Sequence, residues 1–166
     1  MRDGQTEFEQ LYAAYAASVH RFALFLCGNV AQAEDITSET FIRVWTARSP
    51  LREETVKAYL FTIARNLYHQ SGRRERRHVP LDADYVDRHP TAVDNYAQRD
   101  ELAHVLADLQ TLPEIDRAAL VMRATDEVPY EEVASALGLS VAAAKVKVHR
   151  ARRRLVQLKQ HREEVK

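Results

Sequence analysis

The sequence predicts an all-α protein of two small helical domains joined by an acidic linker, the second domain containing a helix-turn-helix. Apolar residues recur every three or four positions along most of the 166 residues, the spacing that places them on one face of a helix. No stretch alternates apolar and polar residues for long enough to propose a sheet, and four Gly and five Pro are too few for a loop-rich all-β chain. The expected boundaries are residues 1–78 for the first domain, 79–97 for the linker and 98–166 for the second domain.

Three helices are expected in the first domain. Thr6, with a Glu three residues later, forms a capping-box pattern that predicts the start of the first helix, and Gly28-Asn29 predicts its end. A second helix follows as far as Ser49-Pro50, and a third runs from about residue 56 to 70. The residues expected to line the core are Phe8, Leu11, Tyr12, Tyr15, Val19, Phe22 and Leu26, then Val30, Ala33, Ile36, Thr40, Phe41 and Val44, then Val56, Tyr59, Leu60, Ile63 and Leu67.

The linker and the start of the second domain differ sharply in pattern. Residues 79–96 carry two Pro and several Asp with no helical period, which is typical of a linker. Pro113 suits the first turn of a later helix, since its missing N–H has no partner there. The apolar residues that open the second helical group are Leu102, Val105, Leu106, Leu109 and Leu112.

Residues 130–154 carry the pattern of a helix-turn-helix. The short amphipathic segment 130–137 is followed by Gly138, where a positive φ is cheap, and by Ser140, a good N-cap for the next helix. The next helix combines small Ala residues on one face with Lys and Arg on the other, as in modules that place a helix in the DNA major groove. The alternative is an alanine-rich packing helix with a solvated basic face.

The charges are segregated although Lys+Arg and Asp+Glu are both 24. Residues 51–80 hold seven basic and three acidic side chains, a net charge of +4, and residues 140–166 hold nine and two, a net charge of +7. Between them, residues 81–116 hold two basic and nine acidic side chains, a net charge of −7. Clustered Lys and Arg attract a phosphate backbone, so two basic clusters favour a nucleic-acid partner over two merely solvated faces.

Several classes of protein are disfavoured. The single Cys fits a reducing compartment, the start has no basic-then-apolar signal, and no apolar run approaches the ~18 residues of a membrane span, so a cytoplasmic protein without membrane contact of its own is expected. The seven His are not paired at metal-ligand spacing, and no glycine-rich phosphate loop is present. We therefore predict no enzyme activity, no catalytic residues, no metal site and no cofactor.

Three motifs, taken in order, resemble one family. The segment LPEIDRAALVMRATDEVPYEEVASALGLSVAAAKVKVHRARRRL resembles the C-terminal DNA-binding domain of sigma-70 family factors, above all the extracytoplasmic-function group of bacterial RNA polymerase sigma factors. AEDITSETFIRVW resembles the polymerase-binding helix of that family, and KAYLFTIARNLYHQSGRRERR resembles its promoter-melting helix. The resemblance covers about residues 6–77 and 100–158.

The resemblance implies a surface for core RNA polymerase. In the family the first domain docks on the clamp helices of the largest polymerase subunit, and the mainly acidic face that matches is Glu34, Asp35, Glu39, Thr40 and Arg43. The alternative for these residues is a solvated helix face. Gln32 departs from the acidic residue usual in the family, which would change the affinity for the clamp.

The resemblance also implies a site for the −10 promoter element. The family melts DNA there and captures a flipped base from the non-template strand, which needs aromatic stacking surfaces and a basic track. The matching residues, in the loop 49–55 and in the third helix and its extension, are Arg52, Tyr59, Phe61, Arg65, Asn66, Tyr68, Arg73, Arg74, Arg76 and Arg77. The alternative for Tyr59 is a place in the core.

A −35 promoter site is implied in the second domain. The matching residues are Tyr130, Ser140, Lys145, Lys147, His149, Arg150, Arg152 and Arg153. By position, Lys145, His149 and Arg150 are expected at base edges, whereas Lys147, Arg152 and Arg153 are expected at phosphates. The run Ala142–Ala144 stands where the family often has Gly-Thr-Val, so hydroxyl contacts of relatives are absent here.

The implied partners are core RNA polymerase, promoter DNA and an anti-sigma factor. In the polymerase, the clamp helices and the flap are expected to be contacted, the flap by a groove around Leu109, Leu112, Leu120 and Val121. In the family the acidic linker threads toward the active site and RNA exit path of the polymerase; the alternative is a solvated tether. A stand-alone helix-turn-helix regulator is the alternative function. It would bind an operator alone as a dimer, whereas a sigma factor would bind DNA weakly without polymerase.

Overall fold

The computed structural model describes residues 2–47, 51–52, 55–75 and 96–166. The described residues form seven helices and no strand, which confirms the predicted all-α fold. The helices are α1 (Arg2–Cys27), α2 (Val30–Ala47), α3 (Val56–Glu75), α4 (Tyr96–Gln110), α5 (Glu114–Asp126), α6 (Tyr130–Leu137) and α7 (Val141–Glu164). Of the predicted linker, residues 79–95 lie outside the described part, and the last two residues begin α4.

The first three helices pack around one apolar centre. The long helix α1 contacts both α2 and α3, and α2 contacts α3. Phe22 of α1 and Phe61 of α3 are fully buried and stack with their ring centroids 4.5 Å apart. Leu26 and Leu60 are also fully buried beside this apolar cluster.

The ends of α1 and α2 show which local signals hold. The predicted stop at Gly28 is confirmed, because α1 ends at Cys27 and Gly28 has a φ of +70°. Asn29 Oδ1 then accepts a hydrogen bond of 2.9 Å from the N–H of Gln32, which caps the start of α2. The predicted start at Thr6 is wrong, since α1 begins at Arg2 and Thr6 lies inside the helix. Val30, expected in the core, is 57 % exposed.

The second group of helices contains the predicted helix-turn-helix. Gly138 adopts the left-handed conformation with φ +66° after α6, and Ser140 caps α7 by accepting a hydrogen bond of 3.1 Å from the N–H of Ala143. Both local predictions are confirmed. Pro113 stands at the N-cap of α5, one residue before the helix rather than within its first turn. α5 packs against both α6 and α7 and supplies the fully buried Met122.

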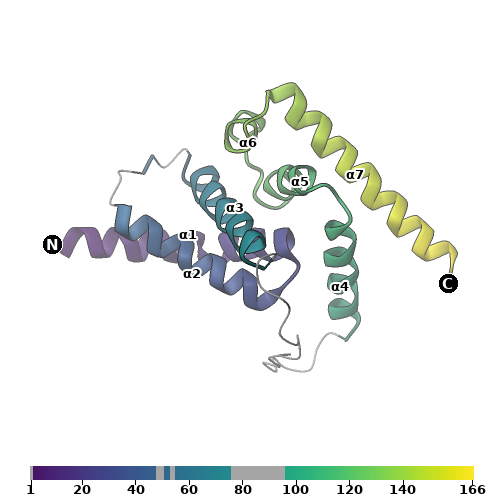
Figure 1. Cartoon of the computed structure of the whole chain (residues 1–166), viewed down its shortest axis with the longest axis horizontal. Coiled ribbons are helices and arrows are strands. Elements are labelled where there is room, and N and C mark those ends of the chain that lie inside the picture. The colour runs from purple at the N-terminus through teal and green to yellow at the C-terminus, as the bar shows by residue number, and fades with distance from the viewer. Residues whose placement is uncertain (1, 48–50, 53–54, 76–95) are drawn as a thin grey trace.

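The two groups of helices are packed against each other rather than held apart. α5 contacts α1 and α3, α6 contacts α3, and α4 contacts α1. Figure 1 shows α5 and α6 beside α3, with α7 on the outer side of α5. Gln110 of α4 donates a hydrogen bond of 3.2 Å to the carbonyl oxygen of Phe25, next to the turn at Gly28. The sequence predicted a linker between two domains and contained no signal for this interface.

Candidate nucleic-acid interface and partner surfaces

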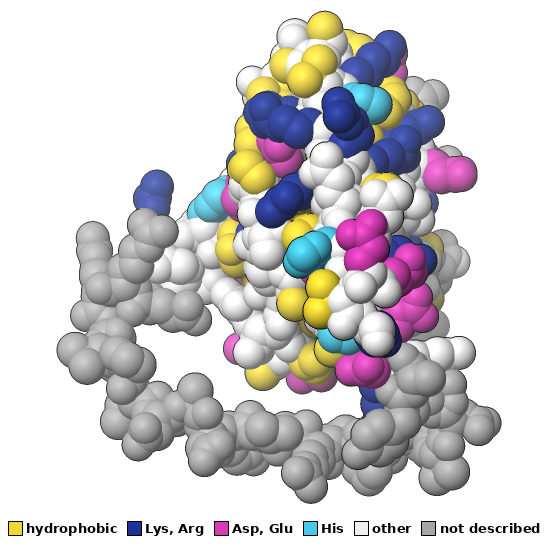
Figure 2. All heavy atoms as spheres, turned by 90° about the vertical axis from the view of Figure 1, so that its right-hand side faces the viewer, with side chains coloured by type: hydrophobic (Ala, Val, Ile, Leu, Met, Phe, Trp, Pro, Cys, Tyr) yellow, Lys and Arg dark blue, Asp and Glu magenta, His cyan; other side chains and the backbone are white. Residues whose placement is uncertain are grey.

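The outer face of α7 carries many exposed basic residues, together with the exposed Val146 and Val156. Ala144, Val148 and Ala151 are buried at helical spacing on the inner face, which turns the basic residues between them outward. The exposed residues of the outer face are Lys145, His149, Arg150, Arg152, Arg153 and Arg154. Figure 2 shows Lys and Arg side chains gathered over the upper part of the face that carries α7, with Asp and Glu gathered below. The arrangement matches a helix that meets a phosphate backbone.

Two of the predicted DNA-binding residues are joined to one buried carboxylate. The side chain of Asp116, in the first turn of α5, is 2 % exposed and accepts hydrogen bonds from Arg150 Nε at 2.8 Å and Arg150 Nη2 at 2.9 Å. Lys147 Nζ lies 3.4 Å from the same carboxylate. Burial raises the pKa of Asp116, but the hydrogen bonds and charges of Arg150 and then Lys147 more than offset this, so its pKa lies below the ordinary value. The sequence predicted Arg150 and Lys147 as DNA-binding residues but did not identify Asp116 as their partner.

The start of the helix-turn-helix is ordered by cation–π contacts. The guanidinium of Arg123 lies 4.8 Å from the ring centroid of Tyr130, and Lys145 Nζ lies 5.6 Å from it. Tyr130 and Lys145 were both predicted to contact DNA, and the structure brings them together. The hydroxyl oxygen of Ser140 accepts the Ala143 N–H as the cap of α7, and its own O–H remains able to donate.

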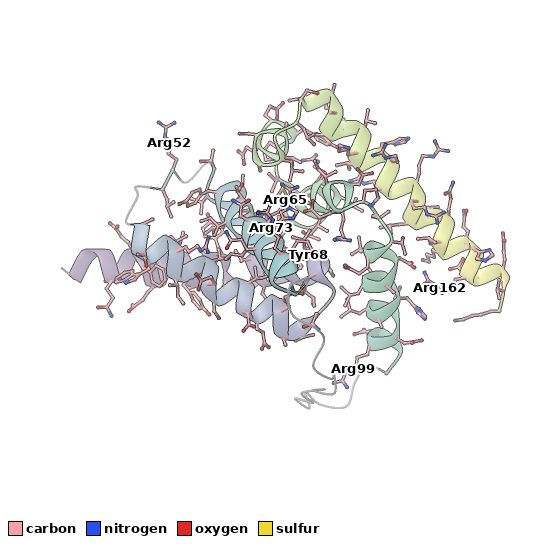
Figure 3. All side chains as sticks on the ribbon, in the orientation of Figure 1. Arg52, Arg65, Tyr68, Arg73, Arg99 and Arg162 are labelled. Carbon is pink, nitrogen blue, oxygen red and sulfur yellow. The ribbon has the colours of Figure 1, made fainter. Side chains whose placement is uncertain are left out.

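The predicted −10 residues of α3 are divided between the interface and the surface. Arg65 donates hydrogen bonds of 2.7 and 2.8 Å to the two carboxylate oxygens of Glu114, and the Tyr68 hydroxyl accepts one of 3.2 Å from Arg117. Figure 3 shows Arg65 and Tyr68 on the part of α3 beside α5, while Arg52 projects from the connection between α2 and α3, away from them.

The remaining −10 candidates differ in burial. Tyr59 is 37 % exposed rather than in the core, and Asn66, Arg73 and Arg52 are exposed. The prediction for Phe61 needs correction, because its ring is fully buried against Phe22 and offers no surface to a base. The side chain of Arg74, and Arg76 and Arg77, lie outside the described part of the chain.

The predicted polymerase face of α2 is largely exposed. Glu34, Asp35 and Arg43 are exposed, and Glu39 forms an ion pair of 3.3 Å with Arg43. The prediction that Thr40 binds the polymerase needs correction, because Thr40 is fully buried. Its hydroxyl donates a 2.7 Å hydrogen bond to the carbonyl of Ile36.

Gln32 has an identifiable structural role. Its side-chain amide donates a hydrogen bond of 2.9 Å to the Ser71 hydroxyl and thereby ties α2 to α3. Gln32 therefore contributes to the packing of α2 against α3.

Sequence reasoning missed an apolar groove beside the α2 face. The groove has a volume of about 710 Å³ and is lined by Phe8 and Tyr12 of α1 and by Phe41, Ile42 and Trp45 of α2, together with polar residues. Ile42 and Trp45 are 56 % and 44 % exposed, on the side of α2 that the expected buried stripe leaves outward.

The prediction of an apolar groove for the polymerase flap needs correction. Leu109, Leu112, Leu120 and Val121 are all at most 5 % exposed, so they form the core between helices instead of an open surface.

Two kinds of feature are absent from the described residues. Within residues 2–47, 51–52, 55–75 and 96–166, no helix is long and apolar enough to cross a membrane. Among the same residues, no group of three or more His, Cys, Asp or Glu is placed to hold a metal ion.

This geometry defines a class: an all-helical protein with a DNA-binding helix-turn-helix and a second helical unit that carries a basic helix. Comparison with known families agrees, since residues 11–78 match sigma-70 region 2 and residues 105–155 match sigma-70 region 4.

Curated relatives match across both units. The chain is 34 % identical to the RNA polymerase sigma factor CarQ of Myxococcus xanthus, covering 95 % of this chain and 92 % of the relative. It is 30 % identical to the ECF RNA polymerase sigma factor SigM of Bacillus subtilis, covering 89 % and 91 %. It spans 60 % of the ECF sigma factor SigE of Mycolicibacterium smegmatis, to which it is 34 % identical. The chain therefore belongs to the extracytoplasmic-function group of sigma-70 family sigma factors.

Two solved structures resemble the whole chain. The sigma factor RpoE of Bartonella quintana, in complex with the anti-sigma factor NepR, superposes with a TM-score of 0.76 at 26 % identity, over 93 % of this chain and 97 % of that one. CnrH in complex with the cytosolic domain of CnrY gives a TM-score of 0.72 at 26 % identity, over 95 % and 90 %.

Proposed function

We propose that this chain is a cytoplasmic transcription initiation factor that binds core RNA polymerase through α2, the −10 element through α3 and the −35 element through α7. It supplies recognition and contributes no catalytic residue, because the polymerase carries out the chemistry. The observation that carries the proposal is the exposed basic face of α7, which begins at an N-terminus capped by Ser140 and is rigidly supported by α5. The family membership supports the same function.

The acidic residues of α2 are assigned to the polymerase. Glu34 and Asp35 are exposed one turn from the Glu39–Arg43 ion pair, so a basic partner surface can approach them without breaking a core contact. We expect Glu34→Lys with Asp35→Lys to weaken binding to core polymerase by about tenfold or more, because charge reversal opposes the complementary potential. Asp100→Lys with Glu101→Lys, at two exposed positions of α4, is the control with the same change of charge.

The packed arrangement is assigned to a closed state. Arg65 and Tyr68 are engaged by α5, so α3 and α5 must separate before these two side chains reach DNA. The similarity of the whole chain to RpoE, which was solved with an anti-sigma factor, supports an anti-sigma factor as the partner that retains this state. Binding to core polymerase would favour the open state by mass action.

The decisive experiment is transcription in vitro with bacterial core polymerase and a library of promoter fragments. New start sites that share a −10 and −35 pair are the expected result. Tight, sequence-specific operator binding by the chain alone as a dimer, with no initiation, would instead establish the stand-alone regulator.

A further inference from the structure

The Asp116 carboxylate binds the basic helix from behind. It belongs to the first turn of α5, and its side chain is 2 % exposed, so it cannot itself approach DNA. Both of its oxygens accept from Arg150, and Lys147, three residues earlier on α7, lies 3.4 Å from one of them. A single acid of the supporting helix therefore touches two cations assigned to promoter contact.

The hydrogen bonds leave one edge of Arg150 available. The guanidinium uses Nε and one proton of Nη2 for Asp116, so both protons of Nη1 and the second proton of Nη2 remain at its outer end. The Arg150 side chain is 59 % exposed. Two parallel donors at that outer end fit a guanine, whose O6 and N7 accept side by side in the major groove.

Lys147 differs from Arg150 in exposure. Its side chain is only 22 % exposed, and its ammonium group lies against Asp116. A compact charge that is held beside a carboxylate contributes less to a sequence-independent attraction for phosphates. Lys147 was predicted to contact a phosphate, and this geometry argues against that prediction.

We propose that Asp116 is a positioning residue for −35 recognition, which holds Arg150 in one orientation at the groove and keeps Lys147 off the phosphate backbone. Both effects raise discrimination: a fixed fork loses less conformational entropy on binding, and a lysine paired with a carboxylate contributes less to non-specific affinity. This inference rests on the proposed assignment of α7 to the −35 element.

The chain provides a matched control. Asp108 of α4 accepts hydrogen bonds from the two terminal nitrogens of Arg162, at the far end of α7. This pair also joins α7 to a preceding helix through an Asp and an Arg, but it lies 12 residues beyond Arg150. Asp108→Asn therefore removes a similar helix–helix contact without touching the recognition surface.

The test uses the full chain with core polymerase and promoters in which each −35 base pair is varied. We expect Asp116→Asn to reduce discrimination about five- to tenfold at the one base pair that Arg150→Ala also affects. We also expect its binding to non-specific duplex to become more dependent on salt, by about one phosphate contact, because Lys147 is released. Asp116→Glu should restore part of the discrimination, and Asp108→Asn should leave it unchanged.

The other outcomes are equally informative. If Asp116→Asn and Asp108→Asn lower the melting temperature alike and leave base discrimination intact, Asp116 is only structural and the inference is wrong. If Asp116→Asn does not fold, Arg150→Lys tests the same point, because it keeps the charge but cannot form the fork; undiminished discrimination would overturn the inference. If the wild-type chain shows no −35 preference with polymerase, the proposed function itself fails.

Discussion

The basic faces of α3 and α7 are held in opposite ways. On α7, Arg150 and Lys147 are paired with Asp116, an acid of the adjoining helix in the same group of helices, and the outer end of Arg150 stays in solvent. On α3, Arg65 and Tyr68 are bound by Glu114 and Arg117 from the other half of the chain. Under the proposed function, α7 can therefore meet duplex DNA in this arrangement, whereas Arg65 and Tyr68 of α3 reach DNA only after α3 and α5 separate.

The interface between the two groups of helices also contains ion pairs. Oδ1 of Asp126 on α5 lies 3.0 Å from Nη2 of Arg21 and 3.8 Å from Nζ of Lys57. Nε2 of His69 lies 3.5 Å from Oε1 of Glu114. The side chains of Arg21 and Lys57 are 43 % and 41 % exposed, whereas that of Asp126 is 2 % exposed, so salt and competing charges act on these pairs through the cations. The acids Glu114 and Asp126 occupy cations that phosphates would otherwise attract. Under the proposed function, promoter phosphates would compete with these two acids for the cations.

The largest effect separates core from contact within α3. Phe61→Ala should cost about 3–5 kcal/mol of unfolding free energy, because a fully buried ring that stacks on Phe22 is replaced by a cavity. Tyr59→Ala, at a side chain 37 % exposed, should cost far less stability and weaken −10 binding instead. Urea unfolding and binding of a −10 oligonucleotide measure the two effects; equal loss of stability in both variants would contradict this division.

The next prediction tests whether the contacts with α5 mask part of α3. Glu114→Gln removes a charged, bidentate partner of Arg65 and should weaken the closed arrangement by about 1–3 kcal/mol. The distance between labels on α3 and α6 should then increase in energy-transfer measurements, and a single-stranded −10 oligonucleotide should bind more tightly to the chain alone. Glu101→Gln on α4 is the control, and an unchanged affinity for the oligonucleotide in Glu114→Gln would show that the interface does not mask α3.

Substitutions at two glycine turns test whether a local change at the interface alters the distance between the two groups of helices. Gly28 and Gly138 have φ values of +70° and +66°, so Ala at either position should cost about 1–2 kcal/mol of backbone strain. At Gly28 a new Cβ would also lie 3.0 Å from the Gln110 side chain of the other half, whereas nothing lies within 4 Å at Gly138. Thermal unfolding should show a similar loss of stability in both, but only Gly28→Ala should change the inter-domain distance. A change in Gly138→Ala as well would indicate a general loosening.

The smallest effect concerns pH. The folded-state pKa of Asp116 is lowered, so the stability that its ionised form contributes is present above the unfolded pKa of about 3.9 and is lost as the pH falls through the lower, folded value. The stability difference between wild type and Asp116→Asn should be constant from about pH 7 to 5 and shrink below about pH 4. Denaturation midpoints between these limits check the sign; a difference that grows on acidification would contradict the ion pairs.

Most helices, the two glycine turns and the family resemblance follow from the sequence pattern alone, although the start of α1 does not. The end of α1 at Gly28, the left-handed Gly138 and the Ser140 cap are local features, because each depends on residues within about one helical turn. The spacing of apolar residues likewise determined the class of fold, and three motifs in order determined the family resemblance. The outward basic face of α7 followed from the same spacing.

Which polar and aromatic faces are already occupied depends on contacts between segments far apart in the sequence. Arg65 and Glu114 are 49 residues apart, and Arg150 and Asp116 are 34 apart, so no local period links them. The burial of Phe61 and Thr40, and the exposure of Ile42 and Trp45, depend in the same way on how α1, α2 and α3 pack. Helical periodicity defines the faces of a helix, but the packing of distant segments determines what each face contacts.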